Sequence, residues 1–410
     1  MTASVEDIRS NFPALERNMA GQPVAYFDGP GGTQVVKPVV DAMGDYLIHH
    51  NANTHWAYPT SAETDAALDA ARSTVAALLN AGPDEIAFGA NMTTLTFHLS
   101  RALGRRWNAG DEVVVTELDH HANIDPWRAL EVERGVVIRM VHMIPESGRI
   151  DMDHLEQVIG SRTRLVAVGA ASNALGTVSD VERVVRMAKS VGALTFVDGV
   201  HSTPHALPDF TALGCDFFAC SAYKFYGPHV GVLAGKRDVI DATDFPRLEP
   251  APSQSPERAE TGTLNHEGIV GTAAAIEWLG SLSPGSGLRD KLQQTYASLH
   301  ERGEVLLARL WSRLDAIPGV TLFGPKPGER RTPTVAFALE GHTSEKVSRM
   351  LGKQGVFVTH GDFYAQTVVR RLGYEQDGLV RAGCACYTTT DEVDRLVSGV
   401  ASLAESRHLV

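Results

Sequence analysis

The fold prediction starts from the stretch Asp216-Phe-Phe-Ala-Cys-Ser-Ala-Tyr-Lys-Phe-Tyr-Gly-Pro228, where an aromatic-rich run that predicts a strand breaks into a turn carrying one lysine. This residue, Lys224, is set among the rings of Tyr223, Phe225 and Tyr226. Poor solvation lowers the pKa of an ammonium group towards the range in which the neutral amine is nucleophilic, as an imine-forming lysine requires. On these residues alone, a surface lysine with its stem along apolar side chains is the alternative.

The composition is that of an ordinary globular protein. The chain has 410 residues, 43% of them hydrophobic and 21% charged, which is enough for one large domain and a smaller one. Its formal net charge of -12 argues against a nucleic acid or an anionic membrane as partner, because both need a basic face. A small metabolite fits better. We find no signal-peptide pattern and no apolar run of membrane-spanning length, and therefore expect a cytoplasmic protein.

The cysteines and histidines do not predict a metal site. The four cysteines are Cys215, Cys220, Cys384 and Cys386. They are too few for a disulfide scaffold and their spacings do not match zinc patterns, so we interpret them as reduced thiols. Two adjacent histidines, His120 and His121, point apart on most backbones and have no third ligand at a sensible spacing. An imidazole stacked on a flat ring is the better interpretation.

Near-continuous apolar runs alternate with helical patterns from residue 86 onward. This alternation predicts an α/β fold with a mainly parallel sheet covered on both faces, in which ligands bind at the carboxyl ends of the strands. The predicted strands are Ile86-Ala-Phe-Gly89, Glu112-Val-Val-Val-Thr116, Val136-Val-Ile-Arg-Met140, Arg164-Leu-Val-Ala-Val-Gly-Ala170, Ala193-Leu-Thr-Phe-Val197, Asp216-Phe-Phe-Ala-Cys220 and Val230-Gly-Val-Leu-Ala234.

The loops after these strands carry the candidate chemistry. Gly89-Ala-Asn-Met-Thr-Thr94 opens a helix and offers N–H groups and hydroxyls either to a phosphate or only to the helix as a cap. Asp198 closes a strand and is either an N-cap or the partner of a charge, such as a protonated pyridine nitrogen. A glycine-rich bend, Asp28-Gly-Pro-Gly-Gly-Thr33, allows a close backbone approach or is a flexible turn. The polar and aromatic segment 50–59 is a candidate pocket lining.

Together these pieces match the binding groups of pyridoxal phosphate. From Asp7 to Val397 the chain resembles the class V aminotransferases of the type I aminotransferase fold, in particular the cysteine desulfurase and isopenicillin N epimerase branch. The matching blocks are Tyr26-Phe-Asp28, Glu117-x-x-His-His-Ala-Asn-Ile-x-Pro-Trp127, Ser172-Asn-x-Leu-Gly-Thr177, Val197-Asp-Gly199, Ser221-x-x-Lys-x-Tyr-Gly-Pro228, Glu260-x-Gly-Thr-x-Asn265 and Val380-Arg-Ala382. The resemblance implies a large domain at 22–275 and a small domain formed by 1–21 and 276–410.

The resemblance also implies the site. It makes Lys224 the lysine that forms the imine, His120 the group against the cofactor ring and Arg381 the clamp for the substrate carboxylate. The residues implied around the cofactor are Lys224, Met92, Thr93, His120, Asn173, Asp198, His201, Ser221, Tyr223 and Thr263. Of these, His201 and Tyr223 depart from the desulfurase pattern, in which glutamine and histidine stand. Because the family donates the region of Thr263 across a dimer interface, a homodimer is expected.

The loop that carries the nucleophilic thiolate in desulfurases lacks it here. In Gly355-Val-Phe-Val-Thr-His-Gly-Asp-Phe-Tyr-Ala-Gln366, Tyr364 occupies the cysteine position, and a phenol cannot replace a thiolate in persulfide formation. A predicted strand over 381–387 places Arg381 on one face and both Cys384 and Cys386 on the other, so we interpret these cysteines as structural. The substrate lining expected besides Arg381 includes His55 and Tyr364.

Three functions remain open. The first is a carbon–sulfur β-lyase on cysteine or an S-substituted cysteine, and it is the expected one because the base, the electron sink and the carboxylate clamp are retained without the thiolate. The second is transamination or other chemistry at Cα, including oxidative, decarboxylating and epimerising variants. The third is a non-catalytic scaffold, which would be indicated by loss of Lys224 or Asp198, and neither is lost.

Overall fold

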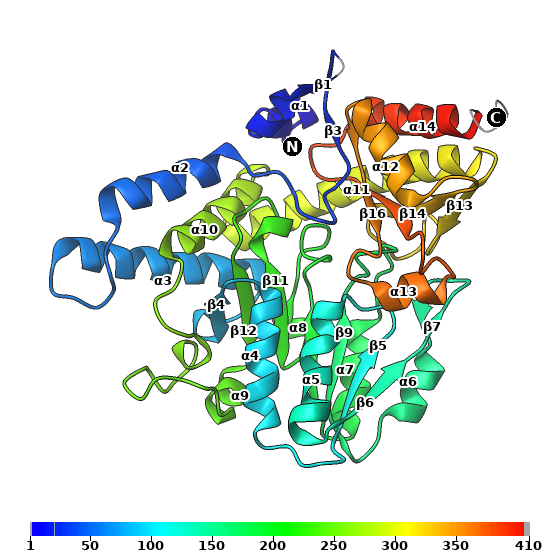
Figure 1. Cartoon of the computed structure of the whole chain (residues 1–410). Coiled ribbons are helices and arrows are strands. Elements are labelled where there is room, and N and C mark those ends of the chain that lie inside the picture. Colours follow the sequence, from blue (N-terminus) through cyan, green and yellow to red (C-terminus); the bar gives the residue numbers. More distant parts are fainter. Residues whose placement is uncertain (1, 20, 406–410) are drawn as a thin grey trace.

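The centre of the molecule is a mixed sheet of seven strands (Figure 1). The computed structural model describes residues 2–19 and 21–405. Strand β12 runs antiparallel to both of its neighbours, and the other strands of this sheet run parallel to one another. In spatial order the strands are β4 (Ile86–Gly89), β12 (Gly231–Gly235), β11 (Phe217–Ser221), β10 (Leu194–Asp198), β9 (Thr163–Gly169), β5 (Glu112–Thr116) and β6 (Val137–Val141). The predicted α/β class with a mainly parallel sheet is confirmed.

Helices cover both faces of this sheet. Because successive side chains of a strand point to opposite faces, Val113 and Val115 pack in one core and Val114 packs in the other. The first core contains residues of α4 (Met92–Gly104), α5 (Asp125–Arg134) and α9 (Arg237–Ala242). The second core contains residues of α3 (Pro59–Leu79), α6 (Met152–Val158), α7 (Val181–Ser190), α8 (Phe210–Leu213) and α10 (His266–Ser281). Burial on both faces explains the near-continuous apolar runs.

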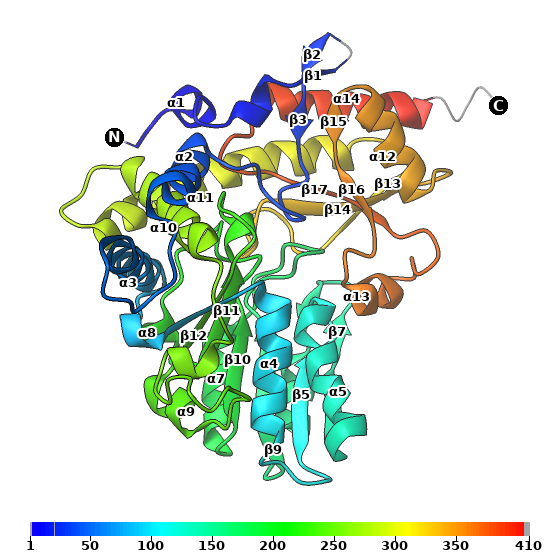
Figure 2. The same ribbon diagram turned by 60° about the vertical axis from the view of Figure 1, so that its left-hand side comes forward.

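A second sheet of four antiparallel strands lies towards the C-terminal part of the chain (Figure 2). Its spatial order is β13 (Val320–Phe323), β14 (Thr334–Leu339), β17 (Leu379–Gly383) and β16 (Thr359–Gly361). A core of its own joins it to α11 (Leu288–Asp315), α12 (Ser344–Lys353) and α14 (Thr390–Glu405). This smaller unit therefore combines an antiparallel sheet with helices, an α+β arrangement.

The predicted strand over 381–387 is wrong in length. Strand β17 ends at Gly383, opposite Thr334, which is the first residue of β14. The residue before it, Pro333, has no N–H with which to continue the ladder, and its carbonyl accepts the N–H of Cys384. The two cysteines therefore follow the strand, yet both remain buried.

The N-terminal segment reaches the smaller unit. Strand β3 (Ala25–Tyr26) pairs in parallel with β15 (Val356–Phe357), so these residues lie with the C-terminal part of the chain. The division at 22 and 276 stays a prediction, and residues 1, 20 and 406–410 of the predicted small domain lie outside the described residues. The remaining elements are α1 (Val5–Arg9), β1 (Asn18–Met19), β2 (Gln22–Pro23), α2 (Lys37–Asp45), β7 (Met143–Ile144), β8 (Arg149–Ile150) and α13 (Gln366–Arg371).

Helices α2 and α3 extend from one side of the molecule (Figure 1). A π-helical turn, Tyr46–His50, follows α2 directly. Across residues 2–19 and 21–405, no helix has both the length and the apolar character needed to cross a membrane.

Candidate active site

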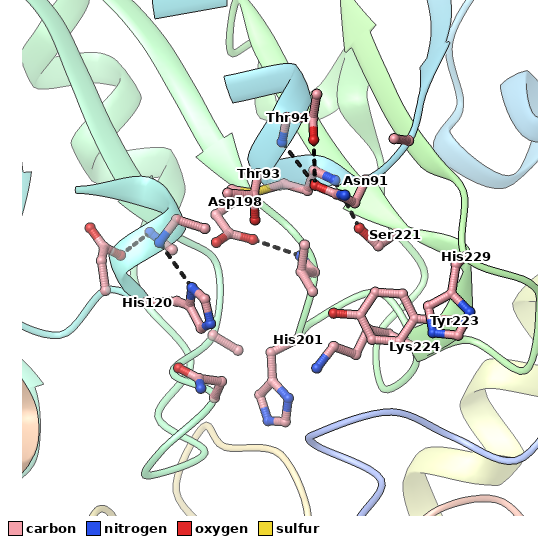
Figure 3. Close-up of a pocket in the computed structure, with 18 residues that line it drawn as sticks. Asn91, Thr93, Thr94, His120, Asp198, His201, Ser221, Tyr223, Lys224 and His229 are labelled. Atoms are coloured by element: carbon pink, nitrogen blue, oxygen red, sulfur yellow. Dashed lines mark hydrogen bonds between the residues drawn. The ribbon is translucent and has the colours of Figure 1, made fainter. Parts of the chain in front are cut away.

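A cavity of about 560 Å³ lies where the loops after β4, β5, β9, β10 and β11 converge. The carboxyl ends of the parallel strands meet at this edge, which is the expected place for a ligand in such a sheet. Figure 3 shows Lys224 and His120 on opposite sides of the cavity. The structure brings together in its lining nine of the predicted residues: Met92, Thr93, His120, Asn173, Asp198, His201, Ser221, Tyr223 and Lys224.

Lys224 follows β11 on a short 3-10 turn and is 8% exposed. Its Nζ donates to the backbone carbonyls of Pro30 and Gly31 and lies 5.0 Å from the centre of the Tyr223 ring. Burial, together with the positive charge of Arg381, lowers the pKa of Lys224 to about 7, and the opposing effect of Asp198 is smaller. The neutral amine is therefore well populated at neutral pH, as the sequence predicts for a nucleophilic lysine.

Asp198 closes β10 and is buried, with Oδ1 accepting the N–H of Val200 at 2.9 Å. Burial raises the pKa of this carboxyl to about 6, and the Val200 N–H and Lys224 oppose the rise. A positively charged ligand atom beside it would favour the ionised form. Asp198 is thus placed to pair with a cation in the cavity.

A second buried carboxyl, Asp119, also lines the cavity and was missed by the sequence analysis. The hydrogen-bonded pairing of β5 with β9 stops at Val114 and Val166, before either strand ends. Beyond this point the Asp119 side chain accepts one N–H from each strand, those of Thr116 and Gly169. Burial raises the pKa of Asp119 to about 8, with nearby Asp198 adding to the rise. Asp119 therefore joins two strands directly before His120.

The His120 ring faces the cavity as a neutral imidazole. Its Nδ1 accepts the N–H of Ala122 at 2.9 Å, which leaves the proton on Nε2. Burial and the positive charges of Lys224 and Arg381 lower the pKa of His120 to about 4. A neutral, immobilised ring of this kind suits stacking against a flat ligand.

The N-terminus of α4 offers donors to an anion. The Asn91 side chain caps the helix by accepting the N–H of Thr94 at 2.8 Å. The N–H of Met92 donates to Ser221 Oγ at 3.0 Å, so the Ser221 hydroxyl proton remains available to a ligand. Gly231 permits this approach, because a Cβ there would lie 2.4 Å from the carbonyl carbon of Asn91. One end of the cavity thus offers backbone and hydroxyl donors, from residues 91–94 and Ser221, of the kind that bind a phosphate.

Arg381 stands beside the cavity rather than in its lining. Its Nη1 donates to the Asn173 carbonyl at 2.8 Å, its Nε donates to Thr359 Oγ1 at 3.1 Å, and its guanidinium carbon lies 4.3 Å from the Phe363 ring centre. Burial lowers the pKa of Arg381 to about 9, with Asp28 and Tyr223 opposing the change. The guanidinium is charged at neutral pH and held on three sides.

The turn at Phe363 and Tyr364 is left-handed at both residues, with φ of 59° and 55°. Asn173 Nδ2 donates to the Phe363 carbonyl at 2.8 Å, and the N–H of His121 donates to the Tyr364 carbonyl at 2.7 Å. The Tyr364 side chain is 74% exposed. The loop around Tyr364, which was predicted to lack a nucleophile, is therefore hydrogen-bonded to the loops that line the cavity.

Some predicted residues lie elsewhere. His55 is exposed and pairs with Asp65, and Thr263 lines a different cavity of its own chain. In contrast, His201 is buried in the site, with Nε2 bonded to the hydroxyls of Thr332 and Thr334, and burial lowers its pKa well below the ordinary value.

His229 was also missed. Its ring stacks on Tyr223 with centroids 5.0 Å apart and planes 18° from parallel.

Among residues 2–19 and 21–405, no group of three or more histidine, cysteine, aspartate or glutamate side chains could hold a metal ion.

Comparison with known proteins agrees with this geometry. The model of the class V aminotransferase family matches residues 25–396. The chain belongs to this family. A cysteine desulfurase of Pectobacterium carotovorum is 34% identical, with 98% of each chain covered. The apo structure of a cysteine desulfurase from Thermococcus onnurineus superposes with a TM-score of 0.89 at 27% identity, covering 99% of both chains. The Escherichia coli desulfurase CsdA, in its S-sulfonic acid form, gives 0.85 at 26% identity, covering 98% of this chain and 99% of its own.

Membership of this family makes the protein a pyridoxal phosphate-dependent enzyme, and the residues present fit that cofactor. Asn173 Oδ1 is a buried acceptor that has no hydrogen-bond partner among the described residues, and Asn173 lines the cavity. The same cavity combines a buried carboxyl, a lysine with a lowered pKa and the polar N-terminus of a helix. This donor set suits a cofactor with a ring nitrogen, an aldehyde, a phenolic oxygen and a phosphate.

Proposed function

We propose that this enzyme is a carbon–sulfur β-lyase acting on cysteine or an S-substituted cysteine. The observation that carries the proposal is the combination of Tyr364 at the expected thiolate position with four cysteines that are all buried. Burial raises the pKa of each thiol to about 12, so none is a ready nucleophile. Sulfur abstraction by a protein thiolate needs that nucleophile, whereas β-elimination does not.

The proposed roles around the cofactor follow the family resemblance and the positions in the cavity. Lys224 holds the cofactor covalently, Asp198 pairs with its ring nitrogen, and His120 stacks on the ring. Asn173 contacts the phenolic oxygen. The phosphate is held by Met92, Thr93 and Ser221, while His201 and Tyr223 supply further polar contacts. When bound, pyridoxal phosphate supplies the electron sink for a pair of electrons left on Cα.

The substrate enters as an amino acid whose α-carboxylate pairs with Arg381. Once the substrate amino group has displaced Lys224 from the cofactor, the free lysine amine would accept the Cα proton as a general base, which its pKa of about 7 favours near neutral pH. Cleavage of the Cβ–S bond releases the sulfur as a thiolate that takes up a proton. Hydrolysis of the remaining carbon fragment yields pyruvate and ammonia, so the overall reaction needs water but neither an oxidant nor a reductant.

We also propose that two copies share their sites. Five exposed apolar side chains gather on α2, on the π-helical turn after it and on the loop before α3: Val40, Leu47, Ile48, Trp56 and Tyr58. Several large exposed apolar side chains in one projecting part of a molecule favour an interface there. Thr263 does not line the active-site cavity of its own chain, so its expected contact with the phosphate requires a partner subunit. A cytoplasmic location is proposed as well, supported by the free, buried cysteines.

A substrate panel tests the reaction. The holoenzyme is incubated with cysteine, S-alkyl cysteines and ordinary amino acids, with and without an oxo acid and oxygen, and products are identified by mass. Pyruvate and free thiol, formed without an acceptor, support the lyase. A requirement for an oxo acid would identify an aminotransferase, and oxygen-dependent products or an epimerised amino acid would identify other chemistry at Cα. Absence of turnover with every substrate would favour the scaffold.

A further inference from the structure

The bend Asp28–Thr33 is held by backbone hydrogen bonds between β15 and the turn that carries Lys224. Before it, the N–H of Phe27 donates to the carbonyl of Phe357, the last residue of β15. At its end, the N–H of Thr33 donates to the carbonyl of Tyr223 at 3.0 Å, and Tyr223 directly precedes Lys224. Inside it, the N–H of Gly31 donates to the Asp28 carbonyl at 2.7 Å. The bend is therefore a fixed part of the site rather than a flexible turn.

The bend touches the lysine through its backbone. The carbonyls of Pro30 and Gly31 both accept hydrogen bonds from Lys224 Nζ. Carbonyl acceptors favour the charged ammonium over the neutral amine. These two oxygens are thus placed to hold Lys224 once its Nζ carries an additional proton.

The bend also lies beside Nη2 of Arg381. Two of the guanidinium nitrogens are bonded to Thr359 and to the Asn173 carbonyl, and Phe363 covers one face. Within residues 2–19 and 21–405, no hydrogen bond of Nη2 is found. A Cβ on Gly31 would lie 3.5 Å from this Nη2 and 3.1 Å from the Asp28 carbonyl oxygen. Glycine at position 31 therefore keeps the space beside Nη2 free.

We propose that Gly31 is a specificity-determining residue, whose missing side chain leaves the space in which the substrate α-carboxylate meets Nη2 of Arg381. The Pro30 and Gly31 carbonyls hold Lys224 on the same side, so one bend positions both the base and the carboxylate. The inference rests on the proposed function only in taking an α-amino acid as the substrate. It holds for any reaction at Cα, whether or not sulfur leaves.

The same bend supplies a matched control. A Cβ on Gly29 would have its nearest contacts at 3.8 Å, with Ala385 Cβ and the Gly383 carbonyl, which is ordinary van der Waals distance. Neither Gly29 nor Gly31 is among the glycines with positive φ. Alanine at either position therefore removes the same backbone freedom, but only at position 31 does it enter the space beside Arg381.

The experiment compares Gly29→Ala, Gly31→Ala and Gly31→Val holoenzymes. Each is titrated with an amino acid and with the corresponding amine that lacks the carboxylate, and the change in cofactor absorbance gives a Kd. We expect the Kd of the amino acid to rise on the order of 10-fold in Gly31→Ala and 100-fold in Gly31→Val, in line with added methyl groups in a pocket. The Kd of the amine should change little, and Gly29→Ala should bind both like wild type.

Two outcomes would overturn the inference. One is wild-type affinity of both Gly31 variants for the amino acid, and the other is an equal loss of the amine. Cofactor absorbance and circular dichroism of each variant identify misfolding, and Gly31→Ala remains informative if Gly31→Val does not fold. Binding is measured without turnover, so the comparison of the Gly31 variants does not depend on which reaction follows. A wild type that binds amino acids but releases no thiol would refute the proposed lyase reaction, while the role of Gly31 would still be tested.

Discussion

The ring of His120 lies 5.6 Å from the ring of Tyr364, with the two planes tilted by 31°. The next residue, His121, donates its N–H to the Tyr364 carbonyl. The residue found at the expected thiolate position is thus packed on the imidazole that lines the cofactor cavity. The Tyr364 side chain is largely exposed and lies next to His120, outside the cavity lining.

Replacing Lys224 by alanine should abolish the covalent link to the cofactor. Borohydride treatment of the wild type should fix a pyridoxyl group on the peptide that contains Lys224, and mass spectrometry of the variant should show none. Loss of the general base should lower kcat by about 100- to 10,000-fold. Pyridoxyl on another lysine of the wild type would refute the cofactor assignment.

The lowered pKa of Lys224 predicts a pH-dependent stability of the apoprotein. Between its folded value of about 7 and the ordinary 10.5, the unfolded chain binds more protons at this group than the folded chain does. The contribution of Lys224 to the free energy of unfolding therefore rises with pH across this window. Urea unfolding should show that the free energy of unfolding of the wild-type apoprotein increases, relative to that of Lys224→Met, from neutral to alkaline pH. A difference that does not vary with pH would contradict this origin.

Arg381→Lys should raise KM far more than it lowers kcat. Lysine keeps the charge but loses the fork that bonds Thr359 and the Asn173 carbonyl while leaving Nη2 free. The lost charge-assisted bonding corresponds to about 2 kcal/mol of substrate binding. Arg302→Lys is the control, because Arg302 is partly buried and likewise bonds two backbone carbonyls, those of Cys386 and Thr388, but outside the active site. An equal rise of KM in both variants would point to general destabilisation.

The cysteines should be inert in the native enzyme. All four are buried and their thiol pKa values are raised to about 12 by burial. An aromatic disulfide reagent should therefore label them slowly until urea unfolds the chain and all become reactive. With cysteine as substrate, no protein persulfide should form, and Cys384→Ala and Cys386→Ala should leave the rate of thiol or sulfide release unchanged. A persulfide on either residue would require a different account of sulfur release.

The apolar surface on α2 and the turn after it predicts dimerisation. Ile48 is 75% exposed, and Ile48→Asp should weaken association, lower the mass found by light scattering and reduce cofactor retention. Val132→Asp is the control, because Val132 is 94% exposed on α5, away from this surface. Thr263→Ala should lower cofactor affinity if Thr263 reaches the partner's phosphate. A wild type that is monomeric with cofactor bound would contradict the shared site.

Much of the fold could be predicted from sequence because the strands are buried on both faces. Their apolar runs stand out, and the rule that ligands bind at the carboxyl ends of parallel strands then brings the loops around Asn173, Asp198 and Lys224 together. The first helix was less predictable. Residues 5–17 have the apolar pattern of one amphipathic helix, but α1 ends at Arg9 and a separate 3-10 turn begins at Pro13, whose ring cannot continue an α-helix.

The site residues that were missed depend on partners distant in sequence. Asp119 resembles any polar loop residue until the chain brings Gly169 to its carboxyl across a gap between two strands. The glycines of the bend at 29–32 indicated a close backbone approach, but the lysine that makes it lies more than 190 residues away. Such contacts follow from how the two sheets meet, and no local pattern encodes that meeting.

The left-handed turn at Phe363 and Tyr364 sets a condition for redesigning this enzyme. Side chains in this backbone region cost about 1–2 kcal/mol each, and the hydrogen bonds from Asn173 and His121 to the two carbonyls help to offset that cost. A cysteine grafted at position 364 would inherit the same pinned backbone. Its thiol would therefore stay next to His120 on a fixed backbone, and loss of the Asn173 hydrogen bond would be the direct way to let it move.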